Sequence, residues 1–433
     1  KEPVLGGTTA WSGGWMWIPR NPLARAAGIE EDTEEVRRYL RHVTGEHFDA
    51  QRLEMFLAHG PAMVDFHLAN TALRFVDGNA IPDFHGRAPG ARTGGRSVCA
   101  APFDASVLGE DLQRLRPPRD ILSFWGMSIG GDLRHFLRAG RAWDSLRYVA
   151  GRLARHAYEV LRHGQGTTRM VGNALAAALL KSALDRGVRL FTSHPAIALL
   201  TEGGRVVGAR VRTPAGEREI RAARGVVLAA GGFPHDAQRQ RALFASTPHW
   251  SAAPLGNQGD GLRLGESAGA QVDGTLAQPG AWAPVSLVPR PDGSVAHFPH
   301  LIERGKPGLI AVDRDGRRFV DEAGNYHTFM RALFARSAQE HPGQPVEAWL
   351  VCDHRFQRRF GLGFSKPWPL PLGPHLRSGY LRRAATIEAL ALACGIDPQG
   401  LAATVRAFNA HARDGRDPEY QRGEIPYDRM QGD

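Results

Sequence analysis

A stretch of nine residues near the start of the chain, GGTTAWSGG at 6–14, has the composition of a ligand-binding loop. It holds four glycines and three hydroxyl side chains, Thr8, Thr9 and Ser12. Glycine permits positive φ and lets another molecule approach the main chain, and short hydroxyls can donate and accept hydrogen bonds. An isolated glycine pair indicates a surface turn. Two glycine pairs with hydroxyls between them favour a loop that faces a phosphate or a flat polar ring.

A further glycine pair ends an apolar segment far along the chain. GVVLAAGGF, residues 225–233, predicts a buried strand that ends in Gly231 and Gly232. Open α/β sheets bind nucleotides at the carboxyl ends of their strands. GNQGDGLRLGESAGA, residues 256–270, predicts a helix with Asp260 near its first turn, where a carboxylate can cap the helix. The strand end therefore indicates a second part of a nucleotide site.

A competing motif lies between these segments. GMSIG at 126–130 fits GxSxG, the nucleophile elbow of serine hydrolases, with Ser128 as the nucleophile. ILSFW before it and DLRHFLRA after it could form the strand and the helix that this motif requires. RLRPPRD upstream is not the flank of a central strand, and no HGGG-type loop precedes it. The pattern is weak support for a hydrolase, because short motifs recur by chance.

Helices must carry much of the chain between these motifs. Apolar residues recur at spacings of three and four in 31–79, and 132–163 and 385–412 also read as helical. VGNALAAALLKSALDRG predicts a helix that ends at Gly187. The Pro/Gly stretch IPDFHGRAPGARTGGRS, 81–97, predicts a long loop. Loops of this length within a domain usually have a function.

Strands and turns are predicted mainly in the second half. VRLFTS at 188–193 and EREIRA at 217–222 predict strands, and PAIALLTEGGRVVGARVRT predicts a hairpin that turns at Gly203-Gly204. PGLIAVDRDGRRFVDE predicts another hairpin, turning at Asp315-Gly316. With the helices, this pattern predicts an α/β protein.

Composition narrows the function class. The chain has 433 residues, 42% of them hydrophobic and 23% charged, which predicts two or three globular domains. No apolar run approaches the roughly 20 residues of a membrane helix, so we expect no integral membrane segment. The formal net charge of +10 is scattered and comes almost entirely from arginine, which argues against nucleic-acid binding and favours an anionic cofactor or substrate.

Cysteine usage indicates a reducing environment. Cys99, Cys352 and Cys394 are far apart in sequence and form no CxxC or His/Cys ligand spacing. Neither a disulfide framework nor a metal site is predicted, and we expect a cytoplasmic protein.

Taken in order, the motifs resemble those of the FAD-dependent fumarate reductase and 3-ketosteroid dehydrogenase superfamily, of the FAD-binding-2 type, and most closely its ketosteroid dehydrogenase-like branch. Six segments across nearly the whole chain carry the resemblance: GGTTAWSGGWMWIPRN at 6–21, PDFHGRAPGARTGGRSV at 82–98, GVVLAAGGFPHD at 225–236, GNQGDGLRLGESAGA at 256–270, GRRFVDEAGNYHTF at 316–329 and GIDPQGLAATVRAFNAHARDGRDPEYQRG at 395–423. The set of six in this order is specific, whereas one alone would not be.

The resemblance implies an FAD cofactor and its contacts. FAD would lie against Gly6, Gly7, Thr8, Thr9, Ser12, Gly13 and Gly14, with Gly231 and Gly232 approaching it from the end of a strand. Asp260 is assigned either a cofactor contact or the cap of its own helix.

The implied fold is a Rossmann-like FAD-binding domain with an inserted α+β substrate-capping domain. We expect the FAD-binding domain at 1–274 and 413–433, and the capping domain at 275–412. Family members begin with a strand, a GxGxxG turn and a helix, and end in a glycine-rich flavin segment with a catalytic tyrosine. Neither end is present in these residues. We therefore expect an incomplete FAD-binding domain, the middle part of a flavoprotein.

The resemblance also implies where the proton is transferred. Flavin dehydrogenation of a saturated ketone needs a hydride acceptor for the β carbon and a base for the α carbon. Four residues after the Glu of the RFVNE-type motif, here Glu322, fumarate reductases carry a proton-donating arginine, and this chain has Tyr326. A guanidinium suits a dicarboxylate, whereas a phenol suits an apolar ketone. We expect Tyr326 to transfer the proton, with His327 as its polar neighbour and a substrate contact; the alternative is a tyrosine that only packs.

The expected substrate is a small molecule, a 3-ketosteroid-like ketone, which is dehydrogenated or formed by reduction and exchanges electrons with an acceptor or donor. Ketosteroid dehydrogenases tend to have a tyrosine where this chain has Phe84, which can line a pocket but has no hydroxyl. Phe84 and Trp125 are expected to contact the substrate, and Trp15, Trp17 and Phe124 could complete an apolar wall. The alternative function is a reductase of an unsaturated carboxylate.

Overall fold

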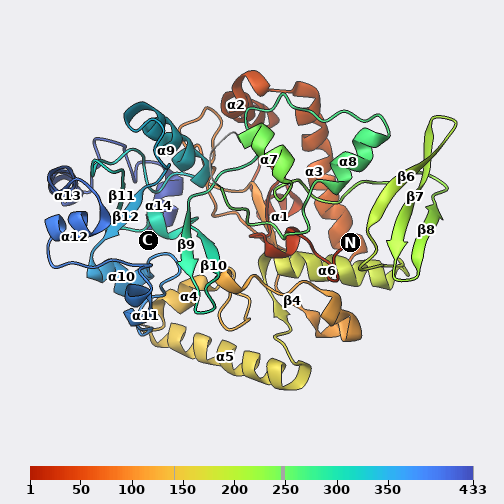
Figure 1. The fold of residues 1–433 in the computed structure, drawn as a ribbon, viewed down its shortest axis with the longest axis horizontal. Helices are drawn as coiled ribbons and strands as arrows, with labels where there is room; N and C mark the ends of the chain where they lie inside the picture. Colours follow the sequence, from red (N-terminus) through yellow and green to blue (C-terminus); the bar gives the residue numbers. More distant parts are fainter. Residues whose placement is uncertain (141, 245–248, 433) are drawn as a thin grey trace.

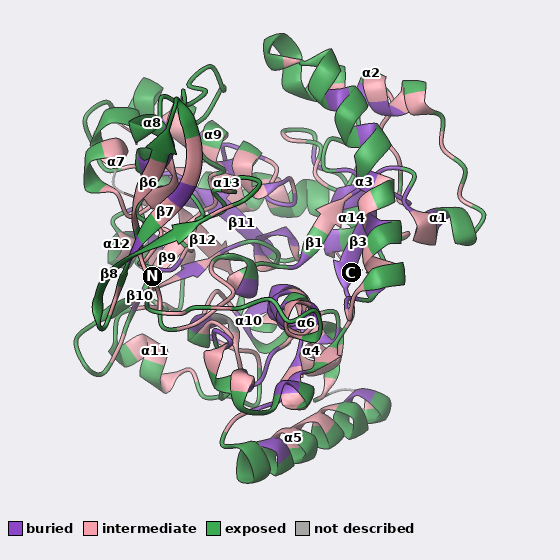
Figure 2. Ribbon diagram, turned by 90° about the vertical axis from the view of Figure 1, so that its right-hand side faces the viewer, coloured by how far each residue is buried: buried purple, intermediate pink, exposed green. Residues whose placement is uncertain are grey.

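The computed structural model describes residues 1–140, 142–244 and 249–432 (Figure 1). The helices at 50–70 and 171–185 and the three-stranded sheet at 196–221 lie on one side of the molecule. The helices at 326–340, 354–360, 387–394 and 398–412, with the strands at 309–312 and 349–352, lie on the other. The long helix α5 runs along one edge and is exposed over most of its length (Figure 2).

The α-helices of these ranges are α1 (Pro22–Ala26), α2 (Thr33–Thr44), α3 (Ala50–Asn70), α4 (Leu133–Arg138), α5 (Trp143–His163), α6 (Val171–Asp185), α7 (Ala237–Phe244), α8 (Asp260–Ser267), α9 (Tyr326–Glu340), α10 (His354–Phe360), α11 (Gly373–Arg377), α12 (Ile387–Cys394), α13 (Pro398–Ala412) and α14 (Pro426–Gly432). Short 3-10 helices are η1 (Thr9–Trp11), η2 (Gly45–His47), η3 (Ala105–Arg114), η4 (Asp120–Leu122) and η5 (Glu303–Gly305). Many of the helices begin at a side-chain cap; Asp49, Asp353, Thr386 and Asp397 each accept a hydrogen bond from the first turn.

The strands are β1 (Trp15–Trp17), β2 (Phe75–Asp77), β3 (Ser97–Ala100), β4 (Phe103–Asp104), β5 (Thr168–Arg169), β6 (Ala196–Glu202), β7 (Arg205–Thr213), β8 (Gly216–Arg221), β9 (Val285–Pro289), β10 (Val295–Pro299), β11 (Leu309–Val312) and β12 (Trp349–Cys352). They form small antiparallel sheets in the orders β1-β3-β2, β4-β5, β6-β7-β8, β9-β10 and β11-β12.

Two packed clusters hold the glycine-rich loop in place. Ala10 of η1 packs against Ala176 and Ala177 of α6 and against leucines of η3. The opposite side of α6 contributes Ala174 and Ala178 to a second cluster with β2 and β3. Small side chains on α6 allow this close approach, so the helix serves as the base on which residues 6–14 rest.

Several predicted elements are confirmed. The helix before Gly187 forms as α6, and 385–412 contains α12 and α13. The predicted hairpin forms as β6 and β7 with both turn glycines at positive φ, and EREIRA lies in β8. The 81–97 stretch is a loop up to β3. Within 31–79, α2 and α3 form as predicted, but 75–77 is strand β2.

The predicted strands at 188–193 and 225–233 are wrong for this structure. Both segments are irregular, and Val227 is 90% exposed. The N–H and C=O groups of a strand need a hydrogen-bonded neighbour, and none of the described strands pairs with either segment. The apolar composition favours a strand, but the pairing that would bury it does not occur among the described residues.

The hairpin predicted at Asp315-Gly316 is only half correct. The turn is present, with Gly316 at φ +70° and its N–H donating to Asp313. The strand before the turn, β11, pairs with β12 instead of with the residues after the turn. A pairing partner more than thirty residues away is invisible to a local turn motif. Among the described helices, none combines the length and apolarity needed to cross a lipid bilayer.

Candidate cofactor and substrate site

The glycines of GGTTAWSGG serve two different purposes. A Cβ on Gly14, which has φ +69°, would lie 2.5 Å from the carbonyl carbon of Val171, so Gly14 lets the loop press on the start of α6. Gly7 has φ +49° and no atom within 4 Å of the position of a Cβ, and Gly13 meets only Trp15 at 3.8 Å. Packing within the protein therefore explains Gly14 but leaves Gly7 and Gly13 facing open space.

Hydroxyl groups surround this open backbone. Thr8, Thr9 and Ser12 are all exposed. The Ser12 hydroxyl donates to the Thr9 carbonyl at 2.8 Å and accepts from the Gly14 N–H at 3.2 Å, which fixes the loop. Exposed main chain beside short hydroxyls can accommodate the pyrophosphate of a dinucleotide. The residues present therefore fit FAD at this loop.

Asn257 joins this loop to two other predicted segments. Its side-chain amide donates to the Thr8 hydroxyl at 2.6 Å, and its amide atoms would lie 3.2 Å from a Cβ on Gly231. The Gly259 N–H also donates to the Gly232 carbonyl at 3.1 Å. The structure thus brings 6–14, 231–232 and 256–260 together, as the sequence predicted. Asn257 itself was not singled out, although it lies inside the GNQGDG motif.

Asp260 does not cap its helix. The N-cap of α8 is Gly259, in the left-handed conformation, and Asp260 is the first helical residue. Its carboxylate instead pairs with Lys1 and with Arg263, the latter at 2.5 Å. The capping alternative is therefore wrong, because the glycine-rich turn places the carboxylate one residue too late. Asp260 and Lys1 lie at the edge of the same loop cluster.

A buried ion network fixes the segment that carries Tyr326. Glu322 is 0% exposed and accepts hydrogen bonds from Arg318 at 2.7 and 2.8 Å, from Arg422 at 3.1 Å and from the Ala311 N–H at 3.0 Å. Arg318 also contacts Asp417 through two bonds of 2.8 Å. Because both charges are paired inside the protein, the FVDE segment is held against β11 and the 417–422 segment.

Tyr326 is placed at the beginning of α9. Asn325 caps the helix by accepting from the Thr328 N–H at 2.9 Å, so Tyr326 is the first helical residue. The partial positive charge of a helix N-terminus stabilises negative charge that develops near it. The side chain is half-buried, within reach of a substrate.

The Phe84 ring lies between Tyr326 and a second tyrosine, Tyr427. The Phe84 ring lies edge-on to Tyr326 with centroids 6.1 Å apart, and edge-on to Tyr427 of α14 at 4.8 Å. Phe84 is 40% exposed, whereas Tyr427 is buried, and burial raises the pKa of Tyr427. Sequence reasoning identified Tyr326 and Phe84 but missed Tyr427, since a single tyrosine near the end of the sequence has no local signal.

Two histidines flank this group. The Nδ1 atom of His327 accepts a hydrogen bond from the Trp282 N–H at 3.1 Å, which leaves Nε2 to carry the proton of the neutral ring. Burial and then Arg331 lower the pKa of His327, and burial lowers that of His85. Both imidazoles are therefore neutral at pH 7, and His327 is oriented by Trp282.

Trp125 and Trp17 do not lie together in the predicted apolar wall. The Trp125 ring is 78% exposed and stacks on Phe124, with no ring contact to Phe84 among the described residues. Trp17 packs on Phe56 and donates to Asp83 at 2.7 Å, so it belongs to the core. A substrate contact by Trp125 stays a prediction.

Ser128 lacks the setting of a nucleophile elbow. It is buried at 4% exposure, and its hydroxyl has no hydrogen-bond partner among the residues that the structure describes. Only an isolated bridge between Phe124 and Met127 precedes it, and α4 begins five residues later. Without a strand before it and a helix directly after it, the GMSIG motif does not support the hydrolase alternative.

Comparison with known proteins points to one family. The family model described as FAD binding domain matches residues 1–432. The chain is 36% identical to the 4-oxocyclohex-2-ene-1-carboxylate 5-dehydrogenase of Sinomonas cyclohexanicum, over 100% of this chain and 73% of that protein. It is 34% identical to the 3-oxosteroid 1-dehydrogenase of Mycobacterium tuberculosis, over 100% of this chain and 77% of that protein.

A solved structure agrees with these relatives. The 3-ketosteroid delta1-dehydrogenase from Sterolibacterium denitrificans, in complex with 1,4-androstadiene-3,17-dione, superposes with a TM-score of 0.86 at 32% identity. The match covers 100% of this chain and 78% of that one.

Proposed function

This chain belongs to the family of flavoproteins that share the FAD binding domain, and we propose that it dehydrogenates a carbon–carbon bond next to the ketone of a steroid-like ring. It is an FAD-dependent oxidoreductase of the 3-ketosteroid dehydrogenase type. The finer assignment, to a steroid-like ring, is supported by the similarity to 3-oxosteroid dehydrogenases.

The observation that carries the proposal is the position of Tyr326 beside Phe84. The phenol lies at the first residue of α9, and the ring beside it is apolar and 40% exposed. An apolar ring of the substrate can pack on Phe84 while its α carbon faces the Tyr326 hydroxyl. A guanidinium, which would bind a dicarboxylate, is absent from position 326.

Each group has a defined role in this proposal. Bound FAD supplies the acceptor for the hydride from the β carbon. Tyr326, as a phenolate, takes the proton from the α carbon and becomes a neutral phenol, and the N-terminus of α9 stabilises the phenolate before the transfer. The Glu322 network holds the segment before α9 against β11 and the 417–422 segment, and Phe84 covers one side of the Tyr326 ring.

Anaerobic flavin reduction tests the role of Tyr326. Addition of a 3-ketosteroid should bleach the flavin absorbance of the wild-type holoenzyme at about 450 nm. Tyr326→Phe should slow bleaching by about 10²–10⁴-fold, the usual contribution of a positioned base. Tyr158→Phe removes an exposed phenol from α5 and should have no effect. Equal rates in the wild type and Tyr326→Phe would refute the proposed role.

A second candidate substrate has its own support. The relative from Sinomonas cyclohexanicum is named for a monocyclic oxo-carboxylate, a much smaller ketone than a steroid. A substrate panel separates the candidates: bleaching by 4-oxocyclohexanecarboxylate and not by 3-ketosteroids would select the small ring. Turnover of fumarate with reduced dye, and none of ketones, would select the reductase of unsaturated carboxylates.

A further inference from the structure

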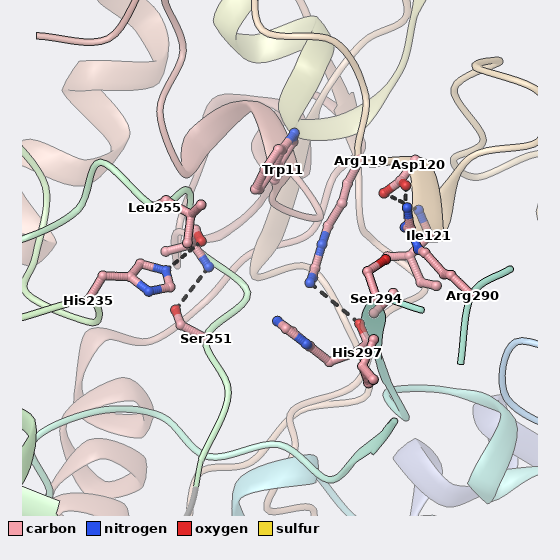
Figure 3. A pocket seen from close by; sticks show the side chains of 13 residues that line it. Trp11, Arg119, Asp120, Ile121, His235, Ser251, Leu255, Arg290, Ser294 and His297 are labelled. Carbon is pink, nitrogen blue, oxygen red and sulfur yellow. Dashed lines mark hydrogen bonds and ion pairs between the residues drawn. The ribbon is translucent and has the colours of Figure 1, made fainter. Parts of the chain in front are cut away.

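A pocket separate from the Tyr326 group lies beside η1. Its volume is about 270 Å³, and it opens between the glycine loop, η4, the 251–255 segment and the β9–β10 hairpin (Figure 3). The lining residues are Trp11, Arg119, Asp120, Ile121, His235, Ser251, Ala253, Leu255, Arg290, Ser294, Val295, Ala296 and His297. None of them is among the predicted cofactor or substrate contacts.

The guanidinium of Arg119 projects into this pocket without a carboxylate partner. Figure 3 shows the side chain pointing toward His297, whose carbonyl accepts a long hydrogen bond of 3.4 Å. Asp120, the adjacent carboxylate, pairs with Arg290 and accepts from the Ile121 N–H. No ion pair joins Arg119 to any carboxylate in the described part of the chain.

A partly buried guanidinium without an ion-pair partner would be stabilised by an anionic ligand. The Trp11 ring lies 5.8 Å from the guanidinium carbon, and burial lowers the pKa of Arg119, so the charge is partly withdrawn from water. A charge taken out of water is costly unless it is paired and hydrogen-bonded. A bound carboxylate would accept two parallel N–H bonds from the fork of Arg119.

Neighbouring side chains add uncharged polar groups. The Nδ1 atom of His297 is buried and has no hydrogen-bond partner among the described residues. Burial and then Arg119 lower the pKa of His297, so the ring is neutral at pH 7. His235 is already engaged, through Nε2, with the Ala253 carbonyl at 3.0 Å. The His297 ring hydrogen-bonds the Ser251 backbone, so Nδ1 is the nitrogen that remains for a ligand.

The rest of the lining combines the Asp120–Arg290 ion pair and the hydroxyls of Ser251 and Ser294 with apolar side chains. Trp11, Ile121, Ala253 and Leu255 face the cavity. Its volume lies just below the range of roughly 300–1,000 Å³ typical of pockets for drug-sized ligands. We propose that this pocket binds a small organic carboxylate, with Arg119 holding the carboxylate and Trp11 and Leu255 contacting a body about the size of one six-membered ring.

Calorimetric titration of the flavin-loaded protein with benzoate tests this site. Arg119→Gln should weaken benzoate binding by at least about tenfold, the effect of losing a charged hydrogen bond. Arg119→Lys keeps the charge without the fork and should give an intermediate affinity. Arg212→Gln removes an exposed arginine of β7 that forms no ion pair in the described structure, and should leave the affinity unchanged.

Four results would overturn the proposal. The first is no benzoate binding by the wild type, and the second is equal affinity in Arg119→Gln. The third is inorganic phosphate binding as tightly as benzoate, because the apolar walls would then contribute nothing. The fourth is benzoate binding to the flavin-free protein alone, which would assign Arg119 to the cofactor site. If Arg119→Gln does not fold, Leu255→Ala replaces it, with weaker benzoate binding expected and unchanged binding contradicting the proposal.

Discussion

Glu322 positions Tyr326 through the backbone, four residues away. Its two oxygens accept from two arginines and one main-chain N–H, and none of it is exposed. A carboxylate so fully occupied has no capacity left for a substrate. At the scale of single residues, the FVDE segment is thus a structural anchor, and the chemistry lies in the residue that it orients.

Replacing Glu322 should destabilise the protein strongly. Glu322→Gln leaves Arg422 and part of Arg318 buried without a counter-charge, which costs about 3–5 kcal/mol in the free energy of unfolding. Urea denaturation followed by circular dichroism measures this loss. Glu340→Gln, which breaks a partly exposed pair with Arg336, should cost less than about 1 kcal/mol. Similar losses for the two variants would show that the buried network is not a major source of stability.

The sequence predicts the kind of site more readily than the role of each residue in it. GGTTAWSGG predicts a loop close to another molecule, but not that Gly14 serves packing while Gly7 faces open space. That difference depends on where α6 lies, which is a tertiary property. Likewise, Asp260 at a helix start allowed a cap, and the left-handed Gly259 decided against it.

At the scale of elements, α14 is fastened to the segment before Tyr326 by two carboxyl groups. Asp321 precedes Glu322, and Asp428 lies in α14; a hydrogen bond links their side chains. Burial and then the neighbouring Asp428 raise the pKa of Asp321 to about 7, and burial raises the pKa of Asp428. The pair can share a proton only when at least one carboxyl is protonated.

The carboxyl pair should make stability depend on pH. An ordinary aspartate has a pKa of about 3.9 in the unfolded chain, so between about pH 4 and pH 7 the folded state binds more protons. The contribution of the pair is fully present below pH 4 and is lost as the pH rises to 7. Asp321→Asn keeps a hydrogen-bonding side chain without this titration.

Chemical denaturation at pH 5 and pH 7.5 measures the effect. The wild type should lose more stability than Asp321→Asn between these values, since the other titrating groups are common to both. Asp414→Asn, at a position with an exposed side chain, is the control and should follow the wild type. An identical pH dependence in the wild type and Asp321→Asn would exclude the shared proton.

Elements with local signals were predictable, whereas those that depend on distant partners were not. The helix α6 and the β6–β7 hairpin follow from apolar spacing and a glycine pair. β11 pairs with β12, and the apolar segment at 225–233 forms no strand at all. Strand formation is a pairwise property, so an apolar run predicts the tendency of one strand and not the presence of its neighbour.

At the scale of the whole molecule, the predicted fold class is confirmed as an α/β protein with an FAD-binding domain and a capping domain. The domain boundaries stay predictions. The 417–424 segment contacts both the loop at 81–97 and the ion network, since Glu424 pairs with Arg87 while Asp417 pairs with Arg318. The last segment therefore connects the loop that carries Phe84 with the ion network that positions Tyr326.

The cofactor site depends on a contact between residues 249 positions apart in the chain. The Asn257 side chain donates to Thr8 and so holds the GNQGDG turn against the glycine loop. Asn257→Asp keeps the shape but replaces the donor with a negative charge. Because FAD is anionic at its pyrophosphate, this charge should weaken FAD binding by about tenfold, the equivalent of about 1.4 kcal/mol.

Titration of flavin-free protein with FAD, followed by quenching of flavin fluorescence, measures this change. Asn257→Ala removes the hydrogen bond without adding charge and should weaken binding less than Asn257→Asp. Asn409→Asp adds the same charge at an exposed position of α13 and should leave the affinity unchanged. If Asn257→Asp binds FAD as tightly as the wild type, the loop cluster at 6–14 and 256–260 does not face the phosphates. A group other than the FAD phosphates would then have to lie beside Gly7.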